Sequence, residues 1–137
     1  MAIIPWRGKF EYKYFRKRAS TAFAVNSLVT EHSDDDTITP ATSSSTAVVG
    51  VCLKKIASTD SDYASNTRIL VALPLDKSSE FLCDTTSTIA ATDEGELHDL
   101  TDAVTVNDAA STNDIMKLKQ FVSSTKGIYT IYKPMFV

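Results

Sequence analysis

The residues of this chain that could do acid–base chemistry are few, and their spacing does not suit it. The two histidines lie beside carboxylates, His32 shortly before an aspartate run and His98 directly before Asp99. Neighbouring side chains in a strand point to opposite faces, so His98 and Asp99 do not predict a catalytic dyad. Glu94 and Glu96 could pair as carboxylates, but nothing around them indicates a substrate cleft. The chain also lacks a nucleophile elbow, a phosphate-binding loop and a dinucleotide-binding glycine motif. We therefore predict that the protein is not an enzyme and uses no cofactor.

Three groups of residues could be metal ligands, and each has a simpler interpretation. The aspartates at 34–36 lack the spaced ligands and central glycine of an EF-hand loop, so they predict a solvated turn. The Asp-Ser-Asp run at 60–62 is typical of turns in which these side chains cap backbone donors. Cys52 and Cys83 lie in apolar runs and are expected to be buried thiols, which could form a disulfide only if their strands were neighbours. We expect no metal site.

The N-terminal segment, residues 1–18, is the most unusual part of the sequence. It carries six lysines and arginines and one glutamate, whereas the whole chain has a net charge of −3. It also holds five of the twelve aromatic residues. Phe10, Tyr12 and Tyr14 alternate with charged residues, a period of two that is typical of an extended strand. Pro5 keeps the start of the segment extended as well.

Three interpretations of this segment are open. It could fold back as an edge strand of its own body, lie across another protein by main-chain pairing, or bind single-stranded nucleic acid. The acidic remainder of the chain disfavours nucleic acid. We favour the second interpretation, a protein partner. The side chains expected to contact that partner are Ile3, Ile4, Trp6, Arg7, Lys9, Phe10, Tyr12, Lys13, Tyr14, Arg16, Lys17 and Arg18.

The remainder, residues 19–137, predicts a single β domain. Ser and Thr account for 32 residues, and no segment shows a sustained helical period. The apolar runs at 48–56 and 68–75 are expected to form the central strand pair. Further strands are expected at 22–29, 38–41, 80–85, 104–107, 115–122 and 128–133, with Gly127 able to take a positive φ in the last connection. We therefore predict an all-β fold, a small barrel or sandwich of about seven to nine strands with an extended N-terminal arm.

Two features of the chain bear on its location. No run approaches the roughly 18 apolar residues needed to cross a bilayer, so no membrane contact is expected. The charged, aromatic N-terminus does not have the apolar centre of a secretory signal. The acidic turn at 31–36 is expected to be solvated, and the apolar tail at 134–137 is expected to need cover from the body or from a neighbour.

Several stretches, taken together and in order, carry a family resemblance. They are Ile4-Pro5-Trp6-Arg7-Gly8-Lys9, residues 23–29 followed by the acidic turn, and residues 39–42, 49–51, 57–64, 69–75, 95, 99–103, 106–107 and 121–126. This order resembles the decoration, or auxiliary, proteins on the capsids of tailed bacteriophages. The resemblance covers nearly the whole chain and consists of turns and strands.

The resemblance implies a compact β domain on the outer surface of a virion. Such proteins bind the assembled shell of the major capsid protein, often as trimers, and stabilise contacts between neighbouring capsid subunits. The N-terminal segment would then supply the contacts to the shell. Two alternatives remain: a carbohydrate- or peptide-binding β module on a virion or cell surface, and a single-stranded nucleic-acid binder that uses the basic segment.

Overall fold

The computed structural model describes residues 1–32 and 34–136, and these residues form an all-β protein, as predicted. The short strands and one 3-10 turn follow from β-branched runs separated by polar turns. In chain order they are β1 (Ile3–Arg7), β2 (Phe10–Arg16), β3 (Ser27–Glu31), β4 (Ile38–Pro40), β5 (Gly50–Cys52), β6 (Arg68–Pro74), β7 (Glu80–Thr85), η1 (Ala91–Asp93), β8 (Leu97–Asp102), β9 (Thr105–Asn107), β10 (Met116–Ser123) and β11 (Lys126–Ile131).

The first sheet closes into a small barrel. Its strand order is β1-β7-β11-β10-β8-β9, and β9 pairs back onto the end of β7. On this edge of β7, residues Asp84 and Thr85 pair with β9, and the residues before them pair with β1. The interior is filled by large apolar side chains such as Phe81, Leu118 and Tyr129, none of which is exposed.

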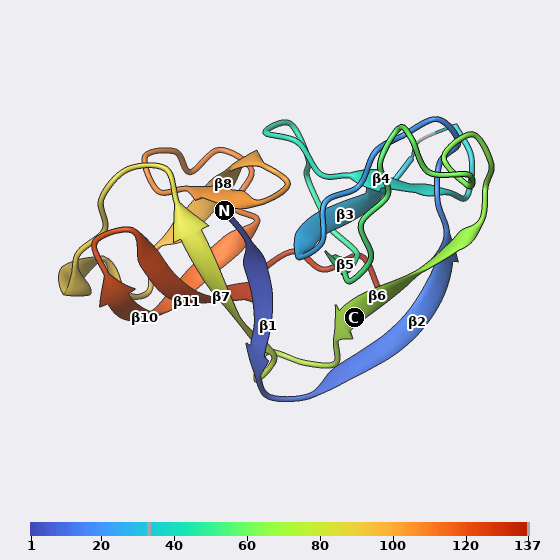
Figure 1. Ribbon diagram of the computed structural model, residues 1–137. Helices are drawn as coiled ribbons and strands as arrows, with labels where there is room; N and C mark the ends of the chain where they lie inside the picture. Colours follow the sequence, from blue (N-terminus) through green and yellow to red (C-terminus); the bar gives the residue numbers. More distant parts are fainter. Residues whose placement is uncertain (33, 137) are drawn as a thin grey trace.

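The second sheet is curled but does not close into a barrel, because its edge strands β2 and β4 do not pair with each other. Its order is β2-β6-β5-β3-β4, and all of its pairs are antiparallel. Strand β4 meets the chain after β2 only at an isolated bridge between Ile38 and Lys17. The concave side holds a separate apolar cluster that includes Val29, Ile69 and Val71. Figure 1 shows the two sheets as neighbouring lobes, with β1 lying on one and β2 on the other.

The N-terminal segment joins the two lobes and belongs to both. Strand β1 pairs with β7, and β2 pairs with β6, so the segment follows the connection between β6 and β7 antiparallel to it (Figure 1). Gly8 lies where the segment crosses, with φ of 96°, and a Cβ there would lie 2.0 Å from the carbonyl oxygen of Ser78. Only glycine fits this turn. Residues 1–18 are therefore extended, as predicted, but they fold back onto their own chain, and no separate arm and body exist.

Several predicted elements differ from the observed ones. The strand expected at 22–29 begins only at Ser27, because Asn26 takes a φ of 59° and breaks the extended run. The strand expected at 48–56 is regular only over β5. Gly127 does not form the turn: it lies within β11, where a Cβ would come within 2.7 Å of the Leu118 side chain. Strand β8 was not predicted. Ser33 in the expected turn at 31–36 and Val137 in the expected tail at 134–137 lie outside the described residues.

Candidate partner-binding surface

Two residues of the expected contact set are buried in their own chain, which corrects the prediction for them. Ile3 has no exposed surface, because it lies opposite Cys83 in the β1–β7 pair and packs in the barrel core. Lys17 is also fully buried, and its ammonium donates hydrogen bonds to the carbonyl oxygens of Tyr63 (3.1 Å) and Ser65 (2.5 Å). Main-chain oxygens thus satisfy the buried cation. Neither side chain can reach a partner in this fold.

The exposed aromatic residues of the N-terminal segment lie on one face of β2 and on β1. Alternation along β2 directs Phe10, Tyr12, Tyr14 and Arg16 to the same side, which we call the tyrosine face. Phe10 is anchored edge-on against Phe81, with ring centroids 5.3 Å apart. Tyr12 and Tyr14 remain 58% and 63% exposed. These two side chains are therefore held on a regular strand while most of their surface faces solvent.

Trp6 is the third exposed aromatic residue of the N-terminal segment, with 53% of its surface accessible, and it lies on β1. It lies at an irregularity in the pairing of β1 with β7, between Pro5 and Arg7. Ile4 beside it is half-buried. Large exposed aromatic residues are typical of binding surfaces, since they bury much apolar area at little entropic cost.

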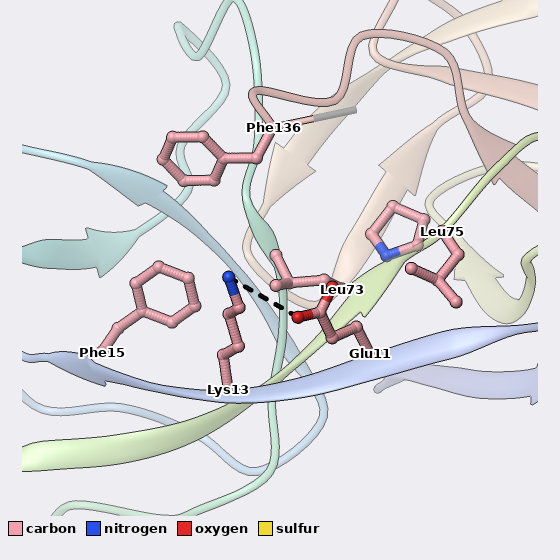
Figure 2. A pocket seen from close by; sticks show the side chains of 7 residues that line it. Glu11, Lys13, Phe15, Leu73, Leu75 and Phe136 are labelled. Carbon is pink, nitrogen blue, oxygen red and sulfur yellow. Dashed lines mark ion pairs between the residues drawn. The ribbon is translucent and has the colours of Figure 1, made fainter.

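The opposite face of β2 borders a pocket. Figure 2 shows Glu11, Lys13 and Phe15 from β2 beside Leu73, Leu75 and the C-terminal Phe136. The pocket measures about 370 Å³, and Pro74 completes its lining. Phe136 stacks parallel to Phe15 at 6.2 Å, so the two ends of the chain form one aromatic wall. Lys13 and Glu11 form an exposed ion pair at 3.5 Å (Figure 2). We call this side of β2 the pocket face.

Most cations of the segment have a neighbouring carboxylate. Arg7 pairs with Glu80 and also donates to Gln120. Arg18 lies near Asp35. Hydrogen bonds from Thr37 are the main cause of the lowered pKa of the Asp35 carboxyl, and the positive charge of Arg18 makes a smaller contribution. Lys9 adds to the hydrogen bonds from Ser78 that lower the pKa of Asp76. These cations are therefore partly neutralised within the chain.

Arg16 is the exception on this surface. It lies directly opposite Arg68 of β6, and both residues are exposed. Within residues 1–32 and 34–136, neither guanidinium forms an ion pair. Like charges placed opposite each other destabilise a strand pair. The pair therefore places two unneutralised cations side by side on the surface.

The histidine–aspartate pair considered as a catalytic candidate has structural roles. His98 is buried, and its Nδ1 lies 2.9 Å from the hydroxyl of Tyr129. Asp99 turns elsewhere and accepts hydrogen bonds from the backbone N–H groups of Thr112, Asn113 and Asp114. Burial raises the pKa of Asp99, but these donors outweigh it and hold the pKa below its ordinary value. The carboxylate is thus occupied in fixing the loop before β10.

The cysteines are buried and unpaired, as expected. Cys52 lies in β5 and Cys83 in β7, in different sheets, and burial raises the pKa of both thiols. No group of three potential ligands is placed to hold a metal ion in the described part of the chain. Over the same residues, no helix has the length and apolar character to cross a membrane.

Comparison with known proteins adds no family to this description. No protein-family model matches the chain, and no curated protein matches it either.

Proposed function

We propose that this protein is a capsid decoration protein of a tailed bacteriophage. It binds the outside of the assembled shell of the major capsid protein, stabilises contacts between neighbouring subunits and carries out no chemistry. The observation that carries the proposal is the surface of β1 and β2, where Trp6, Tyr12 and Tyr14 are exposed beside the unneutralised Arg16.

The fold supports a preformed binding surface. The strands that carry the exposed aromatic residues are paired with β6 and β7 and anchored through Ile3, Phe10 and Lys17. Binding through such a surface does not pay for ordering a flexible segment. The aromatic side chains supply buried area, and the arginine pair sets register and attraction to an acidic surface.

The proposed mechanism of stabilisation is mass action. A protein that binds only the assembled lattice favours the assembled state in proportion to its occupancy. Binding across a seam also requires that two subunits be present together. Self-association into a trimer belongs to the same proposal, and sedimentation velocity of the isolated protein measures it.

A single-stranded nucleic-acid binder is the second candidate, because aromatic residues beside arginines also suit base stacking and phosphate contact. The tyrosine face provides such a combination in Tyr12, Tyr14 and Arg16. The net charge of −3 opposes it, since the rest of the chain repels a polyanion. Titration against an oligonucleotide at several salt concentrations separates the two, because phosphate binding weakens steeply with salt. The carbohydrate- or peptide-binding alternative has no comparable support.

Co-sedimentation tests the proposed function. The purified protein is mixed with assembled shells of the virus that encodes it and, separately, with unassembled capsid subunits. We expect saturable binding to shells and little binding to free subunits. The control variant is Lys119→Glu, which reverses an exposed charge on β10, a strand with no residue of the expected contact set, and should bind as the wild type does. Failure of the wild type to bind shells would refute the proposed function.

A further inference from the structure

Strand β2 is a longer and more regular sheet edge than β1 or β4. It pairs with β6 over all seven residues without an irregularity, and it contains no proline. In contrast, β1 has Pro5 and a shift in register, and β4 is three residues long and ends at Pro40. Natural proteins usually blunt their edge strands, since an open edge pairs readily with another chain. A regular edge of this length, blunted only by its charged side chains, is therefore a candidate docking element.

The backbone groups that face this edge can be assigned from the pairing pattern. The N–H of Leu75 donates to the carbonyl of Lys9, and the N–H of Lys17 donates to the carbonyl of Thr67. Hydrogen-bonded positions alternate along an antiparallel pair, so the odd-numbered residues of β2 bond to β6. The N–H and C=O groups of Tyr12 and Tyr14 consequently point away from β6. Within the described residues, no main-chain group bonds to them.

The free edge of β2 borders the pocket, since Glu11, Lys13 and Phe15 of this strand line it. Strand β4 approaches the chain beyond β2, at the Lys17–Ile38 bridge, and among residues 1–32 and 34–136 no strand pairs with the outer side of residues 10–16. A strand added along β2 would place alternate side chains beside Lys13 and Phe15 on the pocket face. The others would lie beside Tyr14 and Arg16 on the tyrosine face. The pocket walls of Leu73 and Phe136 suit an apolar side chain.

We propose that an extended, acidic segment of the capsid subunit adds to the free edge of β2, with an apolar side chain in the pocket and a carboxylate against Arg16 and Arg68. This inference rests on the proposed function and names the docking mode. The docking segment should be acidic because Arg16 and Arg68 lie opposite each other and form no ion pair in the part of the chain that the structure describes. Main-chain pairing provides affinity in this mode, and the side-chain positions provide specificity.

The geometry also constrains the sequence of the partner. The residue that faces Lys13 lies on the pocket face, and the residue that faces Arg16 lies three positions away on the tyrosine face. A matching segment therefore has an apolar residue and an acidic residue three positions apart. Charged residues on β2 such as Lys13 discourage pairing with other basic or purely apolar strands.

A pair of substitutions at Tyr14 separates main-chain pairing from side-chain contact. Tyr14→Ala removes the ring and keeps the outward N–H, whereas Tyr14→Pro removes both. Proline is tolerated at an edge position whose N–H faces solvent, so both variants should fold. In shell co-sedimentation, we expect Tyr14→Pro to bind at least about tenfold more weakly than Tyr14→Ala, because a main-chain bond to the partner is lost.

A second variant keeps the test decisive if the proline variant does not fold. Phe136→Ala removes one wall of the pocket from a half-exposed tail residue and should weaken shell binding about tenfold without unfolding the protein. If the wild type binds shells while both Tyr14 variants bind equally well, the strand-addition mode is wrong and the proposed function stands. If the wild type binds no shells, the proposed function fails and this docking mode fails with it. Binding of single-stranded oligothymidine that competes with shells would also overturn it.

Discussion

Deletion of residues 1–18 is expected to leave a chain that does not fold. The deletion removes β1 and β2, and with them an edge strand from each lobe. It also removes Ile3 from the barrel core and the Lys17 ammonium that bonds to two loop carbonyls. Burial of one such isoleucine is worth about 1.5–3 kcal/mol. A small domain has a total stability of only about 5–15 kcal/mol, so the combined loss should exceed it.

Circular dichroism and thermal unfolding measure this result. The truncated chain should lack a cooperative transition. The matched control is the full-length triple variant Trp6→Ser, Tyr12→Ser, Tyr14→Ser, which removes the exposed aromatic rings and keeps both strands; it should unfold cooperatively. A truncated protein with a sharp transition would show that the N-terminal strands are dispensable. The truncation is also a poor test of shell binding, since it confounds binding with folding.

Arg16→Glu is expected to stabilise the fold and weaken binding to the shell. Glutamate opposite Arg68 turns a repulsive cross-strand pair into an attractive one, which is worth about 0.2–1 kcal/mol. The same change places a carboxylate where an acidic partner must dock. Like charges brought together at an interface cost several kcal/mol, so shell affinity should fall roughly a hundredfold.

The prediction is specific because the stability of Arg16→Glu should rise while its affinity for shells should fall. Denaturant unfolding gives the change in stability, and shell co-sedimentation gives the change in affinity. The Lys119→Glu control makes the same charge change on β10 and should leave affinity unaltered. Equal shell binding by wild type and Arg16→Glu would remove the arginine pair from the docking surface. Unchanged shell binding by Arg68→Glu as well would show that neither arginine contacts the shell.

Local sequence patterns predicted much of the fold because they depend on neighbouring residues. The alternation in β7 and the apolar run of β6 predicted strands within about one residue of the observed bounds. The pairing partners of the N-terminal segment could not be predicted in this way. Tyr12 lies opposite Ala72, sixty positions along the chain, and only tertiary packing selects that partner. Main-chain pairing with another protein was favoured, and folding back onto its own chain, which the structure shows, was the open alternative.

The candidate surface was predicted only in part, because burial and long-range contacts depend on tertiary packing. Tyr12, Tyr14 and Arg16 belong to the expected contact set and are exposed. Lys17 was misassigned because its residue type is typical of the surface, and alternation did not mark it as buried, since Glu11 and Lys13 on the same side of the segment are exposed. Phe136 was missed as a pocket residue, since its contact with Phe15 joins opposite ends of the chain. No local signal marks that contact.

Residue-resolved hydrogen exchange, read by NMR after brief exposure to D2O with and without assembled shells, tests the docking role of β2 most directly. In the free protein, the amides of Lys13 and Phe15 should exchange slowly and those of Tyr12 and Tyr14 quickly, because only the former bond to β6. Bound to shells, Tyr12 and Tyr14 should become protected as strongly as their neighbours. Rapid exchange at both tyrosines in the shell-bound protein would contradict docking through this edge.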